Sequence, residues 1–124
     1  MANGMPELHS LTPLLSNLQD GGHQIALLTD GRMSGASGSI PAAIHVCPEA
    51  VDNGPIGKIM DGDIITLNAV NGTLEVAADL SSRTSMDLTN MPPQRGFGRT
   101  LFTSMRQHAA IAEVGAGLTL LETK

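Results

Sequence analysis

Apolar positions recur at helical spacing in two segments of the chain. In residues 11–18, leucines are separated by three or four positions and are followed by Gly21 and Gly22, which predicts a short helix that ends at these glycines. A similar spacing in residues 99–112 predicts a second, amphipathic helix. The apolar face of this helix would carry Leu101, Phe102, Met105, Ala109 and Ala112.

Shorter apolar runs predict strands between and after the helices. Residues 23–29 have the continuous apolar character of a strand buried on both faces, and residues 42–46 predict a second strand. Residues 62–79 alternate around Asn71-Gly72, which favours a hairpin with a type I′ turn. The pattern also allows a last strand in residues 115–122 and predicts a polar surface loop in residues 81–98.

The number and brevity of these elements indicate the fold class. A chain of 124 residues has room for one domain, and its predicted strands are short and outnumber its helices. We therefore expect a mixed β/α fold, built as a small β-barrel-like domain with two or three peripheral helices.

Composition excludes several classes of function. The net charge of -5 and the near absence of aromatic residues (Phe 2, Tyr 0, Trp 0) oppose nucleic-acid binding, which uses basic surfaces and aromatic stacking platforms. No apolar run reaches the ~20 residues that span a bilayer, and the first ten residues lack the pattern of a secretory signal. We expect a cytoplasmic protein that binds neither nucleic acid nor membranes.

A glycine- and serine-rich loop, residues 31–39, directly follows the first predicted strand. Its backbone N–H groups could bind an anion, although neither the phosphate-loop nor the dinucleotide-binding pattern is present, and a simple tight turn remains the alternative. Within this loop, Ser34 is either a nucleophile or base, or a turn residue whose hydroxyl bonds the local backbone. Arg32 is a candidate for binding a phosphate, or a support for the backbone.

Carboxylate, histidine and thiol groups offer fewer candidates. Glu7 precedes the first helix, where it could favour the helix N-terminus or serve as an oxygen ligand of Mg²⁺ with partners outside this chain. The four histidines show no zinc-binding spacing. Cys47 is the single cysteine, so this chain alone cannot hold an iron–sulfur cluster, and a small buried residue is the simplest interpretation of it.

Four stretches of the sequence resemble one enzyme family. They are NGMPELHSLTPLL, TDGRMSGASGSIPAAIHVCPEA, GPIGKIMDGDIITLNAVNGTLEV and GRTLFTSMRQ, which are spread from residue 3 to residue 107, so the resemblance extends over essentially the whole chain. The sequence resembles the C-terminal region of the family that contains dihydroxy-acid dehydratase and 6-phosphogluconate dehydratase. RMSGASG followed by IPAAIHV is similar to the 6-phosphogluconate branch.

This resemblance implies specific roles for the candidate residues. It implies a dehydration in which an iron–sulfur cluster acts as a Lewis acid, Mg²⁺ binds the acid end of the substrate, and Ser34 is the base, acting as an alkoxide. Glu7 would be a Mg²⁺ ligand, and Arg32, Gly35 and Ser37 would contact the substrate. Related sugar-acid dehydratases have a threonine where this chain has Ala36, so that hydroxyl is either missing or supplied by Ser37.

The resemblance also implies how the chain is organised. Residues 1–124 would form a single C-terminal swivelling domain that is similar to the mobile domain of aconitases. The cluster ligands would lie in an N-terminal portion of the same enzyme, which we expect to be a homodimer, and this chain alone would be inactive. The expected reaction removes water from 6-phospho-D-gluconate to give 2-dehydro-3-deoxy-6-phosphogluconate, a step of the Entner–Doudoroff route. The alternatives are a dehydratase for dihydroxy acids or other sugar acids, and a non-catalytic binding module.

Overall fold

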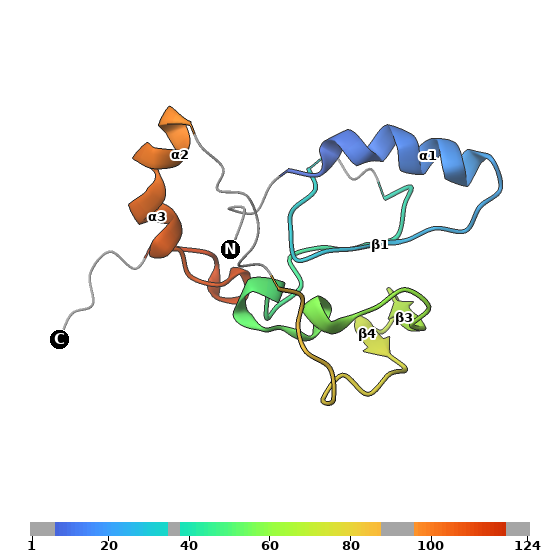
Figure 1. The fold of residues 1–124 in the computed structure, drawn as a ribbon. Helices are drawn as coiled ribbons and strands as arrows, with labels where there is room; N and C mark the ends of the chain where they lie inside the picture. The colour runs from blue at the N-terminus through green and yellow to red at the C-terminus, as the bar shows by residue number, and fades with distance from the viewer. Residues whose placement is uncertain (1–6, 35–37, 88–95, 119–124) are drawn as a thin grey trace.

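Three short α-helices, four 3-10 helices and two two-stranded sheets form the regular structure of the residues that the structure describes. The computed structural model describes residues 7–34, 38–87 and 96–118. In chain order the α-helices and strands are α1 (Thr12–Asp20), β1 (Leu27–Leu28), β2 (Ala42–Ala43), β3 (Ile65–Asn68), β4 (Thr73–Val76), α2 (Phe97–Leu101) and α3 (Thr103–Gln107). In Figure 1, α1 and the β3–β4 hairpin lie on opposite sides of β1, and α2 and α3 lie at the other end of the molecule. The expected mixed fold is confirmed.

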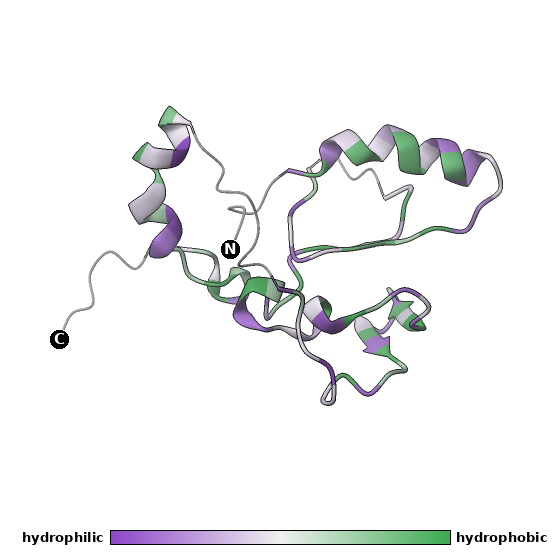
Figure 2. Ribbon diagram, viewed as in Figure 1, coloured by the Kyte–Doolittle hydropathy of each residue, from purple (hydrophilic) through white to green (hydrophobic). Residues whose placement is uncertain are grey.

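Helix α1 confirms the helix predicted at the start of the chain. Pro13 lies in its first turn, where a missing N–H costs nothing. At its end, Gly22 has a φ of +89°, and the N–H of His23 donates to the carbonyl of Leu18 at 3.1 Å. This pairing satisfies a terminal helix carbonyl, and the positive φ explains why glycine follows the helix. Apolar and polar residues are interleaved along α1 (Figure 2), and Leu14 is 62% exposed.

The first sheet is smaller than the sequence predicts. β1 pairs with β2 in parallel, with Leu27 opposite Ala42 and Leu28 opposite Ala43. The strand expected over residues 23–29 is thus reduced to two residues. Both leucines are only half-buried, so the predicted burial on both faces is wrong. An apolar run indicates a strand, but its burial depends on how much structure covers each face.

The β3–β4 hairpin is confirmed, although its turn differs from the prediction. The strands are antiparallel, with Ile65 opposite Val76 and Asn68 opposite Thr73, so four residues form the connection. The Asn68 side chain accepts the N–H groups of Val70 and Asn71 at 3.1 and 3.0 Å. Asn71 does not have the positive φ that a type I′ turn requires. The Asn68 carboxamide, rather than a two-residue turn, therefore organises this loop.

The amphipathic helix expected near the C-terminus is interrupted. Helices α2 and α3 are separated at Phe102, and the predicted apolar face is largely exposed: Leu101 is 61% exposed and Met105 is 46% exposed. Ala109 lies beyond α3 and forms an isolated antiparallel bridge with Leu118. Among the described residues of the predicted last strand, 115–118, Leu118 alone takes part in β pairing, and residues 119–122 lie outside the described ranges.

The described residues of the predicted surface loop, residues 81–98, are not all exposed to solvent. Residues 88–95 lie outside the described ranges, and Ser81 and Ser82 are exposed. Arg83, in contrast, is half-buried and forms an ion pair with Asp63, which fixes this segment beside the start of the hairpin. The polar composition of the segment therefore does not indicate exposure at every position.

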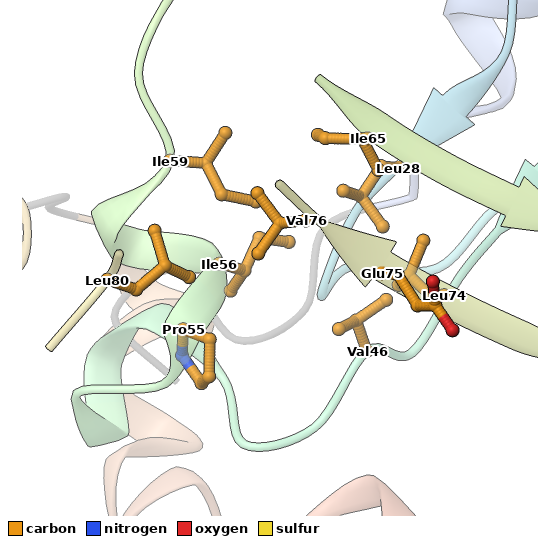
Figure 3. Close-up of a pocket in the computed structure, with 10 residues that line it drawn as sticks. All are labelled: Leu28, Val46, Pro55, Ile56, Ile59, Ile65, Leu74, Glu75, Val76 and Leu80. Carbon is orange, nitrogen blue, oxygen red and sulfur yellow. The ribbon is translucent and has the colours of Figure 1, made fainter. Parts of the chain in front are cut away.

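The apolar interior of the described chain is small. Met33 and Ile40 are its buried hydrophobic residues, each 6% exposed. A cavity of about 100 Å³ lies between the hairpin and the short helical turn Pro55–Lys58 (Figure 3). It is lined by Leu28, Val46, Pro55, Ile56, Ile59, Ile65, Leu74, Glu75, Val76 and Leu80.

Neither sheet closes into a barrel. Within the described ranges, β1–β2 and β3–β4 are separate two-stranded sheets. The barrel-like closure expected from the sequence is therefore not confirmed. None of the helices in this described part is long and apolar enough to cross a membrane.

Candidate functional site

Two segments that are distant in sequence lie side by side at the candidate site. The segment before α1 runs parallel to the loop that follows β1, with an isolated bridge between Glu7 and Arg32. The N–H of Leu8 donates to the carbonyl of Arg32 at 3.0 Å. This pairing brings together Glu7, Arg32 and Ser34, three residues that the sequence analysis selected for separate reasons.

Glu7 is the centre of this arrangement. Its Oε1 accepts the backbone N–H of Ser34 at 2.7 Å and that of His9 at 3.0 Å. Its Oε2 lies 3.7 Å from Nε of Arg32. These interactions lower the pKa of Glu7, chiefly through the Ser34 N–H; partial burial opposes them, and the Ser34 hydroxyl, the His9 N–H and the Arg32 charge add smaller effects. Glu7 is therefore a carboxylate at neutral pH.

The loop alternates buried and exposed positions. Gly31 and Met33 are buried, whereas Arg32 and Ser34 are exposed. Because successive side chains of an extended segment point to opposite sides, burial of Met33 directs its two neighbours outward. Met33 thus anchors the loop and presents a cation and a hydroxyl on one side, a role that the sequence analysis did not assign to it.

The other side of the loop is held by the segment after β2. Asp30 Oδ2 accepts the N–H of Ala50 at 2.9 Å, and the N–H of His45 donates to the carbonyl of Gly31 at 3.0 Å. Within the loop, the Thr29 hydroxyl accepts the N–H of Gly31 at 2.9 Å. The sequence analysis assigned no role to Asp30. Its position before a glycine-rich turn is nevertheless typical of a carboxylate that bonds backbone N–H groups.

Three other residues from the sequence analysis are not part of this arrangement of Glu7, Arg32 and Ser34. Gly35 and Ser37 lie outside the described residues. Cys47 is half-buried, and its thiol donates to the carbonyl of His45 at 3.3 Å. One thiol held in this way does not fit an iron–sulfur cluster, which needs several thiolates.

Glu7 can supply one oxygen ligand to a magnesium ion whose other ligands come from elsewhere. Within the described part of the chain, no group of three or more His, Cys, Asp and Glu residues is arranged to hold a metal ion. Mg²⁺, however, commonly takes only one or two carboxylates from a protein and completes its shell with water and substrate oxygens. Oε2 of Glu7 lies 3.7 Å from Nε of Arg32, whose side chain is 56% exposed and thus able to turn away. The residues present therefore fit one oxygen ligand, with the others supplied from elsewhere.

The apolar cavity is not suited to bind a negatively charged substrate. Its lining is apolar except for Glu75, whose carboxylate would repel an anion. The positive charge of Arg32 and the neighbouring backbone N–H donors suit an anion better. We regard the cavity as incompletely filled core.

Comparison with known proteins agrees with these observations. The family model for the dihydroxy-acid/6-phosphogluconate dehydratase C-terminal region matches residues 1–116. A phosphogluconate dehydratase of Rhizobium meliloti is 50% identical over 120 residues, which cover 94% of this chain and 20% of the relative. For that of Pseudomonas aeruginosa, the identity is 52% over 117 residues, with coverage of 93% and 19%.

A relative from the other branch matches a shorter part of the chain. Dihydroxy-acid dehydratase 2 of Mesorhizobium japonicum is 53% identical over 74 residues, which cover 60% of this chain and 12% of the relative. The chain thus spans about a fifth of the length, or less, of these relatives. The match over residues 1–116 shows that the chain belongs to the dihydroxy-acid/6-phosphogluconate dehydratase C-terminal family.

Proposed function

We propose that this chain is the C-terminal part of a dehydratase that converts 6-phospho-D-gluconate to 2-dehydro-3-deoxy-6-phosphogluconate and water. The observation that carries the proposal is the convergence of Glu7, Arg32 and Ser34 at one exposed site. The relatives that match more than nine-tenths of the chain are phosphogluconate dehydratases, which favours this substrate.

The residues of the chain have distinct roles in this reaction. Ser34 removes the proton from the carbon next to the substrate carboxylate, hydroxide leaves the neighbouring carbon, and the resulting enol becomes the ketone. Arg32 contacts a negatively charged group of the substrate, because its guanidinium is exposed and pairs only loosely with Glu7. Glu7 would hold Mg²⁺, which when bound would supply positive charge for the acid end of the substrate. We propose further substrate contacts for Gly35 and Ser37.

The charge of Glu7 decides when Ser34 can act as a base. A carboxylate next to a hydroxyl disfavours loss of the hydroxyl proton, because two negative charges would then lie close together. A cation bound at Glu7 reverses this effect. We therefore expect Ser34 to be unreactive until Glu7 is neutralised by a bound cation, which links the two residues in one mechanism.

The remaining parts of the enzyme lie outside this chain in our proposal. The iron–sulfur cluster would take its ligands from an N-terminal portion, since this chain has a single cysteine. Residues 1–124 would be one swivelling, barrel-like domain of a cytoplasmic homodimer and would be inactive alone. The share of the relatives that this chain covers supports a larger enzyme.

A second candidate is dehydration of a dihydroxy acid without a phosphate. It is favoured by the similarity to the dihydroxy-acid dehydratase of Mesorhizobium japonicum, although that match covers less of the chain. The reaction chemistry would be the same. The candidates differ in whether the substrate carries a phosphate.

The test is anaerobic turnover by the complete polypeptide, with cluster and Mg²⁺ supplied. Three substrates are compared: 6-phosphogluconate, gluconate and a branched-chain dihydroxy acid. We expect kcat/KM to be highest for 6-phosphogluconate. Preference for an unphosphorylated acid would leave the reaction class intact and contradict the proposed substrate, and turnover by the isolated chain would contradict its proposed dependence on an N-terminal portion.

A further inference from the structure

Both polar groups of the Ser34 backbone are held by the segment that precedes α1. Its N–H donates to Glu7 Oε1 at 2.7 Å, and its carbonyl oxygen lies 3.1 Å from Nδ1 of His9. His9 also donates its own backbone N–H to Glu7. Two residues of one short segment therefore fix Ser34 from both sides.

The partner of His9 determines which ring nitrogen carries the proton. A carbonyl oxygen only accepts hydrogen bonds, so Nδ1 of His9 must be the donor. The neutral ring then has its proton on Nδ1, leaving Nε2 as an acceptor with no hydrogen-bond partner among the described residues. The ring itself is exposed.

Ser34 needs this restraint because its loop is rich in glycine. Glycine has no Cβ to restrict its φ and ψ, so a glycine-rich sequence does not by itself fix the direction of the Ser34 backbone. Bonds to the N–H and the carbonyl of one residue restrict its φ and ψ, and hence the direction of its Cα–Cβ bond. The direction of the Ser34 hydroxyl thus depends on Glu7 on one side and on His9 on the other.

We propose that His9 is a positioning residue that aims the Ser34 hydroxyl through the Nδ1–H bond to the Ser34 carbonyl. The proposal rests on the proposed role of Ser34 as the base. His9 takes no proton from the substrate in this account. Its contribution is orientation, so its loss affects kcat more than KM, because Arg32 continues to bind the substrate.

Three substitutions in the complete enzyme separate this role from others. In His9→Asn the side-chain amide can place an N–H near the position of Nδ1, whereas in His9→Gln it reaches the position of Nε2; His9→Ala has neither donor. We expect the Ala and Gln variants to lose about 10- to 100-fold in kcat with little change in KM, which is the cost of a small misplacement. The Asn variant should recover most of the activity.

His23 provides the matched control. It is an exposed histidine in the turn after α1, and its imidazole makes no hydrogen bond within the described part of the chain. His23→Asn and His23→Gln should both match the wild type. An active Gln variant with an inactive Asn variant would overturn the proposal, because Nε2 would then be the working atom, and so would full activity of His9→Ala.

The tautomer of His9 tests the hydrogen bond without reference to catalysis. Solid-state ¹⁵N spectra of the full-length protein, labelled in histidine and assigned by comparison with His9→Asn, should show the Nδ1–H form for the neutral ring. The Nε2–H form would overturn the proposal. If the wild type turns over none of the three substrates, the proposed function fails, and the tautomer still decides whether His9 holds Ser34.

Discussion

The carboxylate of Glu7 accepts the backbone N–H of Ser34 at 2.7 Å, across a separation of 27 residues. This bond connects two motifs that the sequence presents separately, one before α1 and one after β1. It also places a negative charge beside the hydroxyl that we propose as the base. Without a bound cation, this charge disfavours loss of the Ser34 hydroxyl proton, and a cation bound at Glu7 would remove that effect.

Substitution of Ser34 by alanine tests the proposed base directly. The backbone N–H that donates to Glu7 remains in the variant, so the loop should keep its conformation. We expect kcat of the complete enzyme for 6-phosphogluconate to fall by at least about 10³-fold, because the group that accepts the substrate proton is lost. Substrate binding, measured by calorimetry, should change little.

Ser81 provides the control for this substitution. It is exposed and its hydroxyl donates to Asp79, on a segment that is distant in sequence from Ser34. Ser81→Ala should leave kcat unchanged. An active Ser34→Ala enzyme would make Ser34 a turn residue and would remove the main support for the proposed mechanism.

Replacement of Glu7 by glutamine tests the proposed metal ligand. The amide oxygen can still accept the N–H of Ser34, while the negative charge that attracts Mg²⁺ is lost. We expect the Mg²⁺ concentration for half-maximal activity to rise by about 10- to 100-fold or more, as for weakened metal sites in general. Wild-type activity should likewise be lost with a chelator and return when Mg²⁺ is restored.

Glu75→Gln is the matched control for Glu7→Gln. Glu75 is an exposed glutamate on β4, opposite Thr66 in the hairpin, and its substitution changes the net charge equally. Equal Mg²⁺ requirements of the wild type and Glu7→Gln would show that Glu7 serves only to hold the loop.

The sequence predicts best those features that depend on neighbouring residues. The leucine spacing and Gly22 are local signals, and α1 begins and ends where they indicate. The hairpin is found for the same reason. Its turn type was missed because it depends on the Asn68 side chain, which bonds two backbone N–H groups and extends the loop.

Features that depend on distant contacts could not be predicted from the pattern. The apolar run around Leu27 indicates a strand, but its burial depends on what packs on each face. The motif resemblance selected Glu7 and Ser34, yet only the structure shows that one residue bonds the backbone of the other. The role of Met33 became visible for the same reason, from its burial between two exposed neighbours.

The ion pair between Asp63 and Arg83 predicts a pH dependence of stability. Arg83 Nη2 donates to Asp63 Oδ1 at 2.9 Å, Nη1 donates to Oδ2, and the Met60 N–H donates to Oδ2 at 2.8 Å. The pKa of Asp63 is lowered, chiefly by the hydrogen bonds from Arg83. Because the pKa is lower in the folded state, the stabilisation is present above the ordinary value of 3.8 and is lost as the pH falls through the lowered value.

Thermal unfolding of the wild type and Asp63→Asn across pH measures this effect. We expect the variant to unfold several degrees lower at pH 7, and the difference to shrink as the pH falls below the usual range of an aspartate. Asp61→Asn is the control, because Asp61 is exposed in the same turn. A difference that stays constant down to low pH would show that packing, rather than the charge of Asp63, stabilises this turn.

Gly54 is predicted to be irreplaceable because the backbone of residues 48–49 approaches it closely. A Cβ at this position would lie 1.8 Å from the carbonyl oxygen of Pro48 and 2.7 Å from that of Glu49. Both are backbone atoms, so they cannot turn aside as a flexible side chain would. Gly54→Ala should therefore destabilise the fold by at least roughly 1–3 kcal/mol, the usual cost of overpacking.

The damage from Gly54→Ala should extend to the candidate site. Residues 48–54 form the turn that contains Ala50, whose N–H holds Asp30 at the start of the Ser34 loop. We expect a lower Tm together with faster proteolysis of that loop. Gly98→Ala is the matched control: Gly98 lies in α2 with nothing within 4 Å of the added carbon, so alanine should stabilise the helix by about 0.5–1 kcal/mol. Equal Tm values for the two variants would contradict the close approach at Gly54.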